Sequence, residues 1–500
     1  MNSDESAVPT DADAKRSASA AEPTWDPGID EDIELLRKLG YKQELNRALG
    51  LFSSFGVQFS SIAIASALFT TLIVGLGFFG PASFWSYAIG GAAQVFLVGL
   101  AVGELVSAYP LSGGVYQIIT RITRIRWLAW QSGWWLVIAH TVATAAVAVS
   151  LVPFLANWFG FGDLSGFQTS LFALALVVFV TIVNLAGVKA AALLNNVGVV
   201  AEIVGAVLII GALLVVKHDT QPLSILSNTG GTTTGGWVQP LLFAMILPAY
   251  LISSFDATGN AAEETKNAAK TAPMGTFLAN TLAYVVGLVF MFLAIRAIPD
   301  VDRIMTSETP MKDILDSAVG RTVTSLFEVI AIVALLATMA MLQLTGVRVV
   351  WSQARDGQLP AATWLRKVSS NRIPVNATFV CAALSIVFVF WSSALSVLAA
   401  LTALAWALAY GVVVTAGLRA VVRKQLPTHP WRLGPASIPV FAGAVLWSVL
   451  LCVLLVWSDW KNVGLGMVGA IAVGWVLYLL IPASRRGKIS GVDHSSELQQ

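Results

Sequence analysis

The sequence predicts an all-α polytopic membrane protein with twelve transmembrane helices. The chain of 500 residues is 56% hydrophobic and only 12% charged, whereas soluble domains carry about 25% charged residues. Its apolar residues form runs close to the roughly 20 residues that an α-helix needs to cross a bilayer. Lys and Arg gather in the segments between these runs. These three features exclude a soluble globular fold.

Each predicted span is an apolar run between polar or turn-forming residues. In chain order the spans are 51–78, 84–108, 127–154, 170–186, 196–216, 238–259, 277–298, 325–351, 375–392, 395–418, 438–457 and 463–481. Lys189, Asn195 and Asn196 mark the expected turn between the fourth and fifth spans. Cys381 and Cys452 lie inside apolar runs, so we expect free thiols, with neither a disulfide framework nor a metal site.

The two ends of the chain are polar. Residues 1–30 are mainly Ala, Ser, Asp, Glu and Pro, a composition that cannot bury enough apolar surface to fold, so we expect a disordered cytoplasmic tail. Residues 31–50 form an amphipathic approach segment, and residues 482–500 a second cytoplasmic tail. No secretory signal pattern precedes the first span.

The distribution of Lys and Arg predicts the orientation. If the N-terminus is cytoplasmic, 24 of the 30 basic residues fall on the cytoplasmic side and 6 on the outer side. Because cytoplasmic loops are enriched in Lys and Arg, we expect both termini inside and a multi-pass protein of the plasma (inner) membrane. The oligomeric state is not indicated.

Catalytic and nucleotide-binding motifs are missing from the sequence. It contains no phosphate-binding Gly loop, zinc-ligand spacing or nucleophile elbow. We therefore expect a transport protein that is not an enzyme, has no ATPase of its own and does not bind nucleic acid. Its expected partners are a small molecule and the lipid bilayer. No cofactor is expected, apart from a proton or sodium ion as a coupling ion.

Residues 245–273 carry the most informative polar cluster. Ser253, Ser254 and Asp256 follow an apolar run near the expected middle of the bilayer, and Pro273 ends the segment. A carboxylate there costs roughly 2.5–3.5 kcal/mol even on lenient insertion scales. A helix broken at this depth must bury its freed backbone groups in protein or face water. Both features are typical of a secondary transporter's binding site; a short re-entrant loop with a solvated Asp is the alternative.

The first span offers a partner for this break. Ser60, Ser61 and Ser66 lie among small residues at mid-depth. They either form a partner to the break in the sixth span or bond back to carbonyl groups one turn earlier. The first and sixth spans are five apart, as expected if spans one to five and six to ten are inverted repeats.

Two further motifs lie at predicted cytoplasmic ends of helices. Residues 104–116 read ELVSAYPLSGGVY, where Pro110 cannot continue a helix. Residues 348–360 read RVVWSQARDGQLP. A charged turn held by Gly and Pro suits a gate or a structural latch. Glu263 and Glu264 are expected to stabilise the inner half of the sixth helix and to pair with basic loops.

With these motifs in order, the chain resembles amino acid permeases of the amino acid–polyamine–organocation superfamily. It is most similar to the amino acid/choline transporter branch, which includes GABA and choline permeases. The resemblance covers about residues 30–480. The resemblance rests on four motifs. They are LRKLGYKQELNR at 36–47, the motif at 104–116, FDA at 255–257 with EETKN at 263–267 and Pro273, and ARDG at 354–357 with Leu359 and Pro360.

The resemblance implies a LeuT-type fold. Residues 51–216 and 238–418 would be the two inverted repeats of five helices, and residues 438–481 the last two helices. The substrate would lie between the broken helices one and six. The residues that match the family's pocket are Ile64, Ala65, Ser66, Ala67, Ser253, Ser254, Phe255 and Asp256.

The resemblance also implies roles for these residues. The N-terminus of a half-helix offers free N–H groups that suit a substrate carboxylate, whereas unwound carbonyl groups and Asp256 suit an ammonium group. Phe255 would close over the ligand as an aromatic lid. Many relatives have glycines at the first break, where this chain has Ala65-Ser66-Ala67.

Further residues complete the expected machinery. Glu104, Glu263, Glu264, Arg355 and Asp356 are candidates for a gate or a structural motif. Glu202 in the fifth span is the candidate for binding the coupling ion, because relatives carry a Lys near this position; an ion pair or a snorkelling side chain is the alternative. His140 either lines the pocket or is a satisfied core residue.

We therefore expect a secondary active transporter that imports an amino acid or a related amine, GABA-like or choline-like, by alternating access. A proton or sodium gradient would drive it as a symporter. Two alternatives remain open from the sequence: an uncoupled facilitator or exchanger of cationic amines, and a transporter-like nutrient sensor.

Overall fold

The computed structural model describes residues 27–43, 47, 49–123, 125–162, 164–215, 220–233, 236–369 and 373–486. These residues form helices joined by turns, with a single isolated β-bridge between Leu49 and Thr265. The all-α polytopic fold is thus confirmed. Helix α2 (Pro27–Lys38) includes the last four residues of the predicted tail, and residues 1–26 and 487–500 lie outside the described part.

The first five predicted spans correspond to seven helices. They are α3 (Leu51–Ile62) with α4 (Ile64–Phe79), α5 (Ser83–Ala93) joined by a π-helical turn to α6 (Leu100–Ala108), α8 (Arg126–Phe159), α9 (Gly166–Ala186) and α10 (Val188–Val215). A further helix, α7 (Gly114–Thr123), begins within the motif at 104–116.

The second half repeats the pattern of a broken first helix followed by long ones. It comprises α11 (Val238–Phe243), α12 (Ile246–Leu251), α13 (Ala257–Asn260), the 3₁₀ turn η4 (Ala262–Glu264), α14 (Ala268–Arg296), α15 (Val301–Met305), α16 (Pro310–Val319), α17 (Arg321–Arg355), α18 (Ala362–Leu365), α19 (Val375–Trp391), α20 (Leu395–Val422), α21 (Ser437–Ser458) and α22 (Leu465–Leu480).

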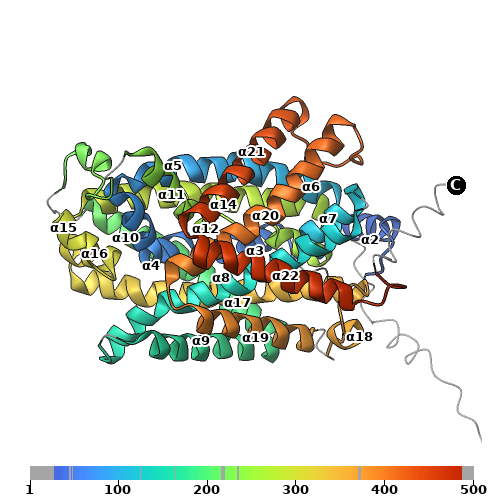
Figure 1. Ribbon diagram of the computed structural model, residues 1–500, viewed down its shortest axis with the longest axis horizontal. Coiled ribbons are helices and arrows are strands. Elements are labelled where there is room, and N and C mark those ends of the chain that lie inside the picture. Colours follow the sequence, from blue (N-terminus) through green and yellow to red (C-terminus); the bar gives the residue numbers. More distant parts are fainter. Residues whose placement is uncertain are drawn as a thin grey trace, which may run out of the picture.

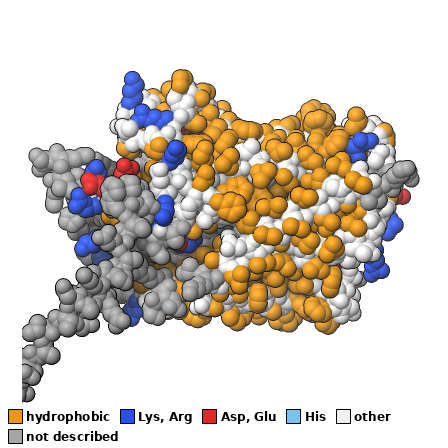
Figure 2. Space-filling model, turned by 180° about the vertical axis from the view of Figure 1, so that it is seen from behind, with side chains coloured by type: hydrophobic (Ala, Val, Ile, Leu, Met, Phe, Trp, Pro, Cys, Tyr) orange, Lys and Arg blue, Asp and Glu red, His pale blue; other side chains and the backbone are white. Residues whose placement is uncertain are grey.

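The surface is that of a protein embedded in lipid. The long helices run side by side, with α2, α7 and α18 at one end of the molecule and α15 and α16 at the other (Figure 1). Hydrophobic side chains cover the flank between these ends, whereas Lys and Arg gather at the ends themselves (Figure 2). Exposed large apolar residues on the outer helices, such as Val207, Leu446 and Leu479, therefore contact lipid chains.

Nine helical segments among the described residues are long and apolar enough to cross a membrane, and two shorter apolar helices accompany them. One of the nine runs from Leu51 to Ala108 over 58 residues. It would be about 87 Å long if straight, nearly three times the hydrocarbon core of a bilayer, and the 3₁₀ turn Gly80–Ala82 interrupts it. These segments accommodate twelve crossings, and the count of twelve stays a prediction.

The predicted turn at Lys189, Asn195 and Asn196 is wrong. The chain turns at Gly187, whose φ of 125° is readily available only to glycine. Helix α10 starts directly afterwards and includes both asparagines. The side chain of Asn195 is buried inside the bundle, so a polar residue in this run does not mark a loop.

Pro273 was predicted to end the polar segment, and this prediction is wrong. Pro273 lies inside α14. Proline removes the hydrogen bond to the carbonyl group four residues earlier, which here belongs to Ala269. The hydroxyl of Ser107 on α6 donates a 2.5 Å hydrogen bond to that carbonyl oxygen. The neighbouring helix thus satisfies the acceptor that proline frees, and α14 continues.

Gly198 is expected to be essential for the packing of α10 against α17. A Cβ atom at this position would lie 2.2 Å from the Cβ of Ala337, whereas a Cβ at Gly211 on the same helix would meet nothing within 4 Å. Gly198→Ala should therefore lower the free energy of unfolding by about 1–3 kcal/mol through overpacking. The thermal midpoint of the purified protein in detergent measures this effect. In the matched control, Gly211→Ala should leave the midpoint unchanged or raise it; equal midpoints for both variants would contradict the close packing.

Candidate functional site

The first helix break lies at Ala63, between α3 and α4. Ala63 has left-handed backbone angles, φ 43° and ψ 58°, which are costly for any residue other than glycine. The predicted pocket residues Ile64, Ala65, Ser66 and Ala67 form the first turn of α4, and all four are buried. The break thus forms without glycine, two residues before Ala65-Ser66-Ala67, where many relatives have their glycines.

The second break separates α12 from α13. Ser254 also has a positive φ, 59°, so a non-glycine residue with positive φ lies at each break. Ser253, Ser254, Phe255 and Asp256 connect the two helical pieces and are buried. Such strain persists only where surrounding contacts enforce it, and it is typical of functional sites.

Side chains join the broken segments to each other and to α17. The amide of Gln58 on α3 donates a 3.2 Å hydrogen bond to the carbonyl oxygen of Ser253. Thr338 on α17 donates one of 2.8 Å to the carbonyl oxygen of Ser60. Ser61 bonds to the carbonyl oxygen one turn earlier, the alternative considered for these serines. Protein groups therefore satisfy carbonyl groups near both breaks at membrane depth.

Asp256 is the centre of a buried polar cluster. Its carboxylate is fully buried and accepts hydrogen bonds from the Tyr410 hydroxyl at 2.5 Å and from the Asn260 amide at 2.7 Å. The Nε2 atom of His140 on α8 lies 3.1 Å from the same carboxylate. His140 thus belongs to the site, while its Nδ1 atom has no hydrogen-bond partner among the described residues.

Phe255 packs beside this cluster. Its ring is fully buried and meets the ring of Tyr410 edge-on, with 5.5 Å between the centroids. A Cβ atom at Gly99, in the π-helical turn of the second span, would lie 3.2 Å from the Phe255 ring. The predicted role of Phe255 as a lid stays a prediction; here the ring packs in the core.

Glu202 caps α4, the second half of the first span. The carboxylate of this buried residue on α10 accepts a 2.6 Å hydrogen bond from the Ala65 N–H and a 2.5 Å bond from the Ser66 hydroxyl. Free N–H groups and the positive end of the helix dipole at an N-terminus attract anions. Glu202 therefore occupies the place on α4 where a substrate carboxylate was expected, and it neither snorkels nor forms an ion pair among the described residues.

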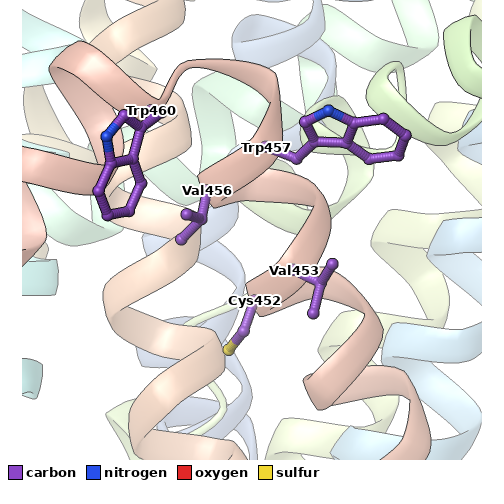
Figure 3. A pocket seen from close by; sticks show the side chains of 5 residues that line it. All are labelled: Cys452, Val453, Val456, Trp457 and Trp460. Carbon is purple, nitrogen blue, oxygen red and sulfur yellow. The ribbon is translucent and has the colours of Figure 1, made fainter.

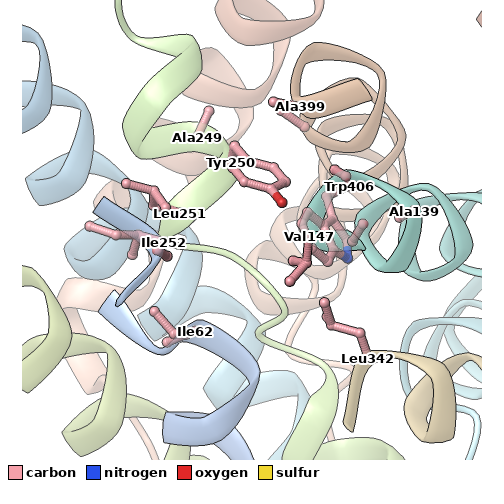
Figure 4. Packing of buried hydrophobic residues seen from close by; sticks show 14 of the residues in the cluster. Ile62, Ala139, Val147, Ala249, Tyr250, Leu251, Ile252, Leu342, Ala399 and Trp406 are labelled. Carbon is pink, nitrogen blue, oxygen red and sulfur yellow. The ribbon is translucent and has the colours of Figure 1, made fainter. Parts of the chain in front are cut away.

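Aromatic and aliphatic side chains from several helices face one another near the breaks. Tyr250 of α12 points toward Val147 of α8 and Trp406 of α20, while Leu342 of α17 approaches from another side (Figure 4). The indole N–H of Trp406 is buried without a hydrogen-bond partner among the described residues. This group offers apolar and π surfaces next to the polar cluster.

Ion pairs join the helices at the end of the molecule that carries α2, α7 and α18, which is predicted to be cytoplasmic. Arg355 at the end of α17 contacts the fully buried carboxylate of Glu263 through two N–O distances of 3.1 and 3.2 Å. Glu263 also accepts the Ser112 N–H. Arg348 pairs with Glu264 at 2.9 Å in a partly exposed position. We call this set the cytoplasmic cluster; it joins η4 to α17 and to the turn before α7.

Asp356 extends the cytoplasmic cluster toward the approach segment. Its carboxylate accepts hydrogen bonds from Tyr41, Tyr116 and Gln117. Burial, followed by the adjacent Asp356 carboxylate, raises the pKa of Tyr41 to about 12, so its hydroxyl stays protonated and donates at neutral pH. The guanidinium group of Arg355 lies 4.3 Å from the centre of the Tyr41 ring, a cation–π contact.

The approach segment also holds the inner half of the sixth span. Arg47 donates hydrogen bonds to the carbonyl oxygens of Ala262 and Thr265. Asp32 accepts the N–H groups of Asn267 and Ala268 at 2.6 and 3.1 Å, which satisfies free donors at the start of α14. Residues before the first span therefore contact η4 and the start of α14.

Glu104, predicted for a gate or a structural motif, lies apart from these groups. It accepts hydrogen bonds from the Ser437 hydroxyl at 2.9 and 3.1 Å, and His429 lies 3.5 Å away. These contacts anchor the start of α21 to α6.

A shallow hollow on the outer surface has none of this chemistry. Cys452, Val453, Val456, Trp457 and Trp460 line it (Figure 3). It lacks acidic or basic groups, so it offers no charged partner for a substrate. No group of three His, Cys, Asp or Glu residues that could hold a metal ion occurs in the described part of the chain.

Comparisons with known proteins agree with this geometry. Residues 49–477 match the family model described as amino acid permease. The chain is 24% identical to the amino-acid permease BAT1 homolog of Oryza sativa, over 87% of this chain and 90% of the relative. It is 23% identical to amino-acid permease BAT1 of Arabidopsis thaliana, over 86% and 88%. It is also 24% identical to the thiamine transporter thi9 of Schizosaccharomyces pombe, over 85% and 80%. The family match spans most of the chain, and the chain therefore belongs to the amino acid permease family.

Proposed function

We propose that this protein is a secondary active transporter that imports an amino acid or a related amine by alternating access. A proton or sodium gradient drives the uptake across the plasma membrane, with both termini in the cytoplasm. Members of its family are transport proteins rather than enzymes. Beyond family membership, we propose the direction of transport, the ion gradient that drives it and the site where the substrate binds.

The observation that carries the proposal is the pair of helix breaks at Ala63 and Ser254, with the buried Asp256 beside the second break. Helix breaks at membrane depth are tolerated where protein or a water-filled cavity receives the freed backbone groups, and secondary transporters build their binding sites from such breaks. Asp256 supplies a charge that can pair with an ammonium group. The aromatic rings of Tyr250, Phe255 and Trp406 suit the apolar and cationic parts of an amine.

The cytoplasmic cluster supports alternating access. Glu263 and Arg355 close the inner side with a largely buried ion pair, so release into the cell requires this cluster to separate. Because Arg47 and Asp32 bind the same region, we propose that the approach segment moves with the inner half of the sixth span.

Glu202 remains our candidate for the residue that binds the coupling ion. Its carboxylate bridges α10 and α4 beside the first break, where binding of a cation would change the contact between these helices. The similarity to the thiamine transporter thi9 also supports the extension from amino acids to other amines, because thiamine is an organic cation without a carboxylate.

Two measurements on purified protein test this function. A thermal-shift screen against amino acids and amines identifies ligands, since a ligand stabilises the state that it binds in proportion to RT ln(1 + [L]/Kd). Uptake of the strongest ligand is then followed in reconstituted vesicles under an imposed pH or sodium gradient. We expect one gradient to raise the initial rate and to cause accumulation above the outside concentration.

Other outcomes would reject symport. Uptake that equilibrates at the same rate with and without either gradient would identify a facilitator or exchanger. Binding without any uptake would identify a sensor. Vesicles with the Glu202→Gln variant test the coupling role, because their uptake should lose its dependence on the driving gradient.

A further inference from the structure

We propose that the substrate is a cationic amine without a carboxylate, and that Glu202 excludes amino acids by filling the anion-binding end of α4. This inference rests on the proposed transport function and names its substrate class. It departs from the expectation that α4 binds a substrate carboxylate, and it excludes GABA, which carries one.

The anion-binding end of α4 is already occupied by the protein. The Ala65 N–H and the Ser66 hydroxyl both bind the Glu202 carboxylate at 2.5–2.6 Å. Helix α4 has 16 residues, long enough for its N-terminus to favour a negative charge. A substrate carboxylate would have to displace Glu202, which is covalently tethered, and would leave this carboxylate buried and unsatisfied.

The balance of charge points the same way. Asp256 and Glu202 are both buried near the breaks, and among the described residues His140 is the one basic group that contacts either of them. A buried carboxylate needs a counter-charge or hydrogen bonds. An ammonium group supplies the missing positive charge, whereas a zwitterion would bring a third carboxylate with no Lys or Arg to receive it.

Unpartnered atoms beside Asp256 complete the argument. The Nδ1 atom of His140, the Oδ1 atom of Asn260 and the hydroxyl of Ser254 are buried without hydrogen-bond partners among the described residues. Each can accept a hydrogen bond, and two of the three residues contact the Asp256 carboxylate directly. Buried polar atoms are normally paired, and an ammonium group with several N–H donors is the complementary ligand.

The test compares amines with the amino acids that differ from them by one carboxylate. The pairs are putrescine and ornithine, agmatine and arginine, and histamine and histidine. Their affinities for the wild-type protein are measured by thermal shift and by competition for uptake into vesicles. We expect at least one amine to bind about 100-fold or more tightly than its amino acid, because the carboxylate would be buried without a partner.

A variant tests whether Glu202 causes the exclusion. Glu202→Ala frees the donors of Ala65 and Ser66, so the preference for the amine over its amino acid should fall by at least tenfold. Acetate at millimolar concentration should raise the thermal midpoint of Glu202→Ala but not that of the wild type, because it can refill the vacated anion site. Glu202→Gln, which still accepts a hydrogen bond, should keep most of the preference.

The outcomes separate this inference from the proposed function. Wild-type protein that binds and transports an amino acid as tightly as its matching amine would overturn the inference and leave the transport function intact. An unchanged amine preference in a folded Glu202→Ala variant would remove Glu202 as its cause. Absence of binding and uptake for both members of every pair would overturn the proposed function, and the inference with it.

Discussion

The Asp256→Asn variant is expected to bind its amine substrate roughly 100 to 4000 times more weakly than the wild-type protein. The Asp256 carboxylate is fully buried and held by Tyr410, Asn260 and His140, so it is poised at a fixed position. Removing one partner of a buried charge pair costs about 3–5 kcal/mol, and each 1.4 kcal/mol is tenfold in affinity. Binding by thermal shift and initial uptake in vesicles measure the loss.

The control for this variant is Asp302→Asn. Asp302 lies on α15 at the opposite end of the molecule from the cytoplasmic cluster, and it is exposed. The same chemical change there should leave affinity, uptake and the amount of protein in the membrane unchanged. Wild-type uptake by Asp256→Asn at equal membrane abundance would remove Asp256 from the binding mechanism.

The second large effect is expected at the cytoplasmic cluster. Arg355→Met would leave Glu263, which is fully buried, without its counter-charge. We expect the free energy of unfolding to fall by about 3–5 kcal/mol, measured as a lower thermal midpoint. Uptake should fall as well, because the inner side would no longer close.

A second substitution distinguishes the ion pair from simple loss of packing. The double variant Glu263→Gln with Arg355→Met removes both charges of this pair, so its midpoint should lie above that of Arg355→Met alone. Arg348→Met breaks the more exposed pair with Glu264 and should cost about 1 kcal/mol or less. Equal losses from Arg348→Met and Arg355→Met would show that burial of Glu263 is not what stabilises the closed side.

Local patterns in the sequence predicted the membrane fold and the polar segment at Asp256. A low charge content and long apolar runs follow directly from contact with lipid, and a carboxylate within such a run is conspicuous because it is costly. The sequence predicted that Glu263 and Glu264 pair with basic residues, but it did not identify the partners. The structure shows that these are Arg355 and Arg348.

The partners of Asp256 were not predictable in the same way. His140 and Tyr410 lie 116 and 154 residues away in the chain, and no local periodicity reports contacts at such separations. His140 was weighed as a pocket residue, whereas Tyr410 was missed. A lone tyrosine in the strongly apolar run of α20 was the available signal, because a buried hydroxyl usually finds a hydrogen-bond partner.

The first break shows a different limit. Glycine normally marks a left-handed residue, and none is present near Ala63. Here Glu202 on α10 satisfies the N–H group and the hydroxyl at the start of α4, so tertiary contacts stabilise a conformation that the local sequence disfavours. Because of these contacts, the start of α4, where a substrate carboxylate was expected, is occupied by a side chain of the protein itself.

The most direct test of the account is an experimental structure of the protein with its tightest-binding amine. We expect the amine between the two breaks, with its ammonium nitrogen within about 3–4 Å of the Asp256 carboxylate and Glu202 still bound to Ala65 and Ser66. An amine bound elsewhere, or a ligand carboxylate in place of Glu202 at the start of α4, would contradict it.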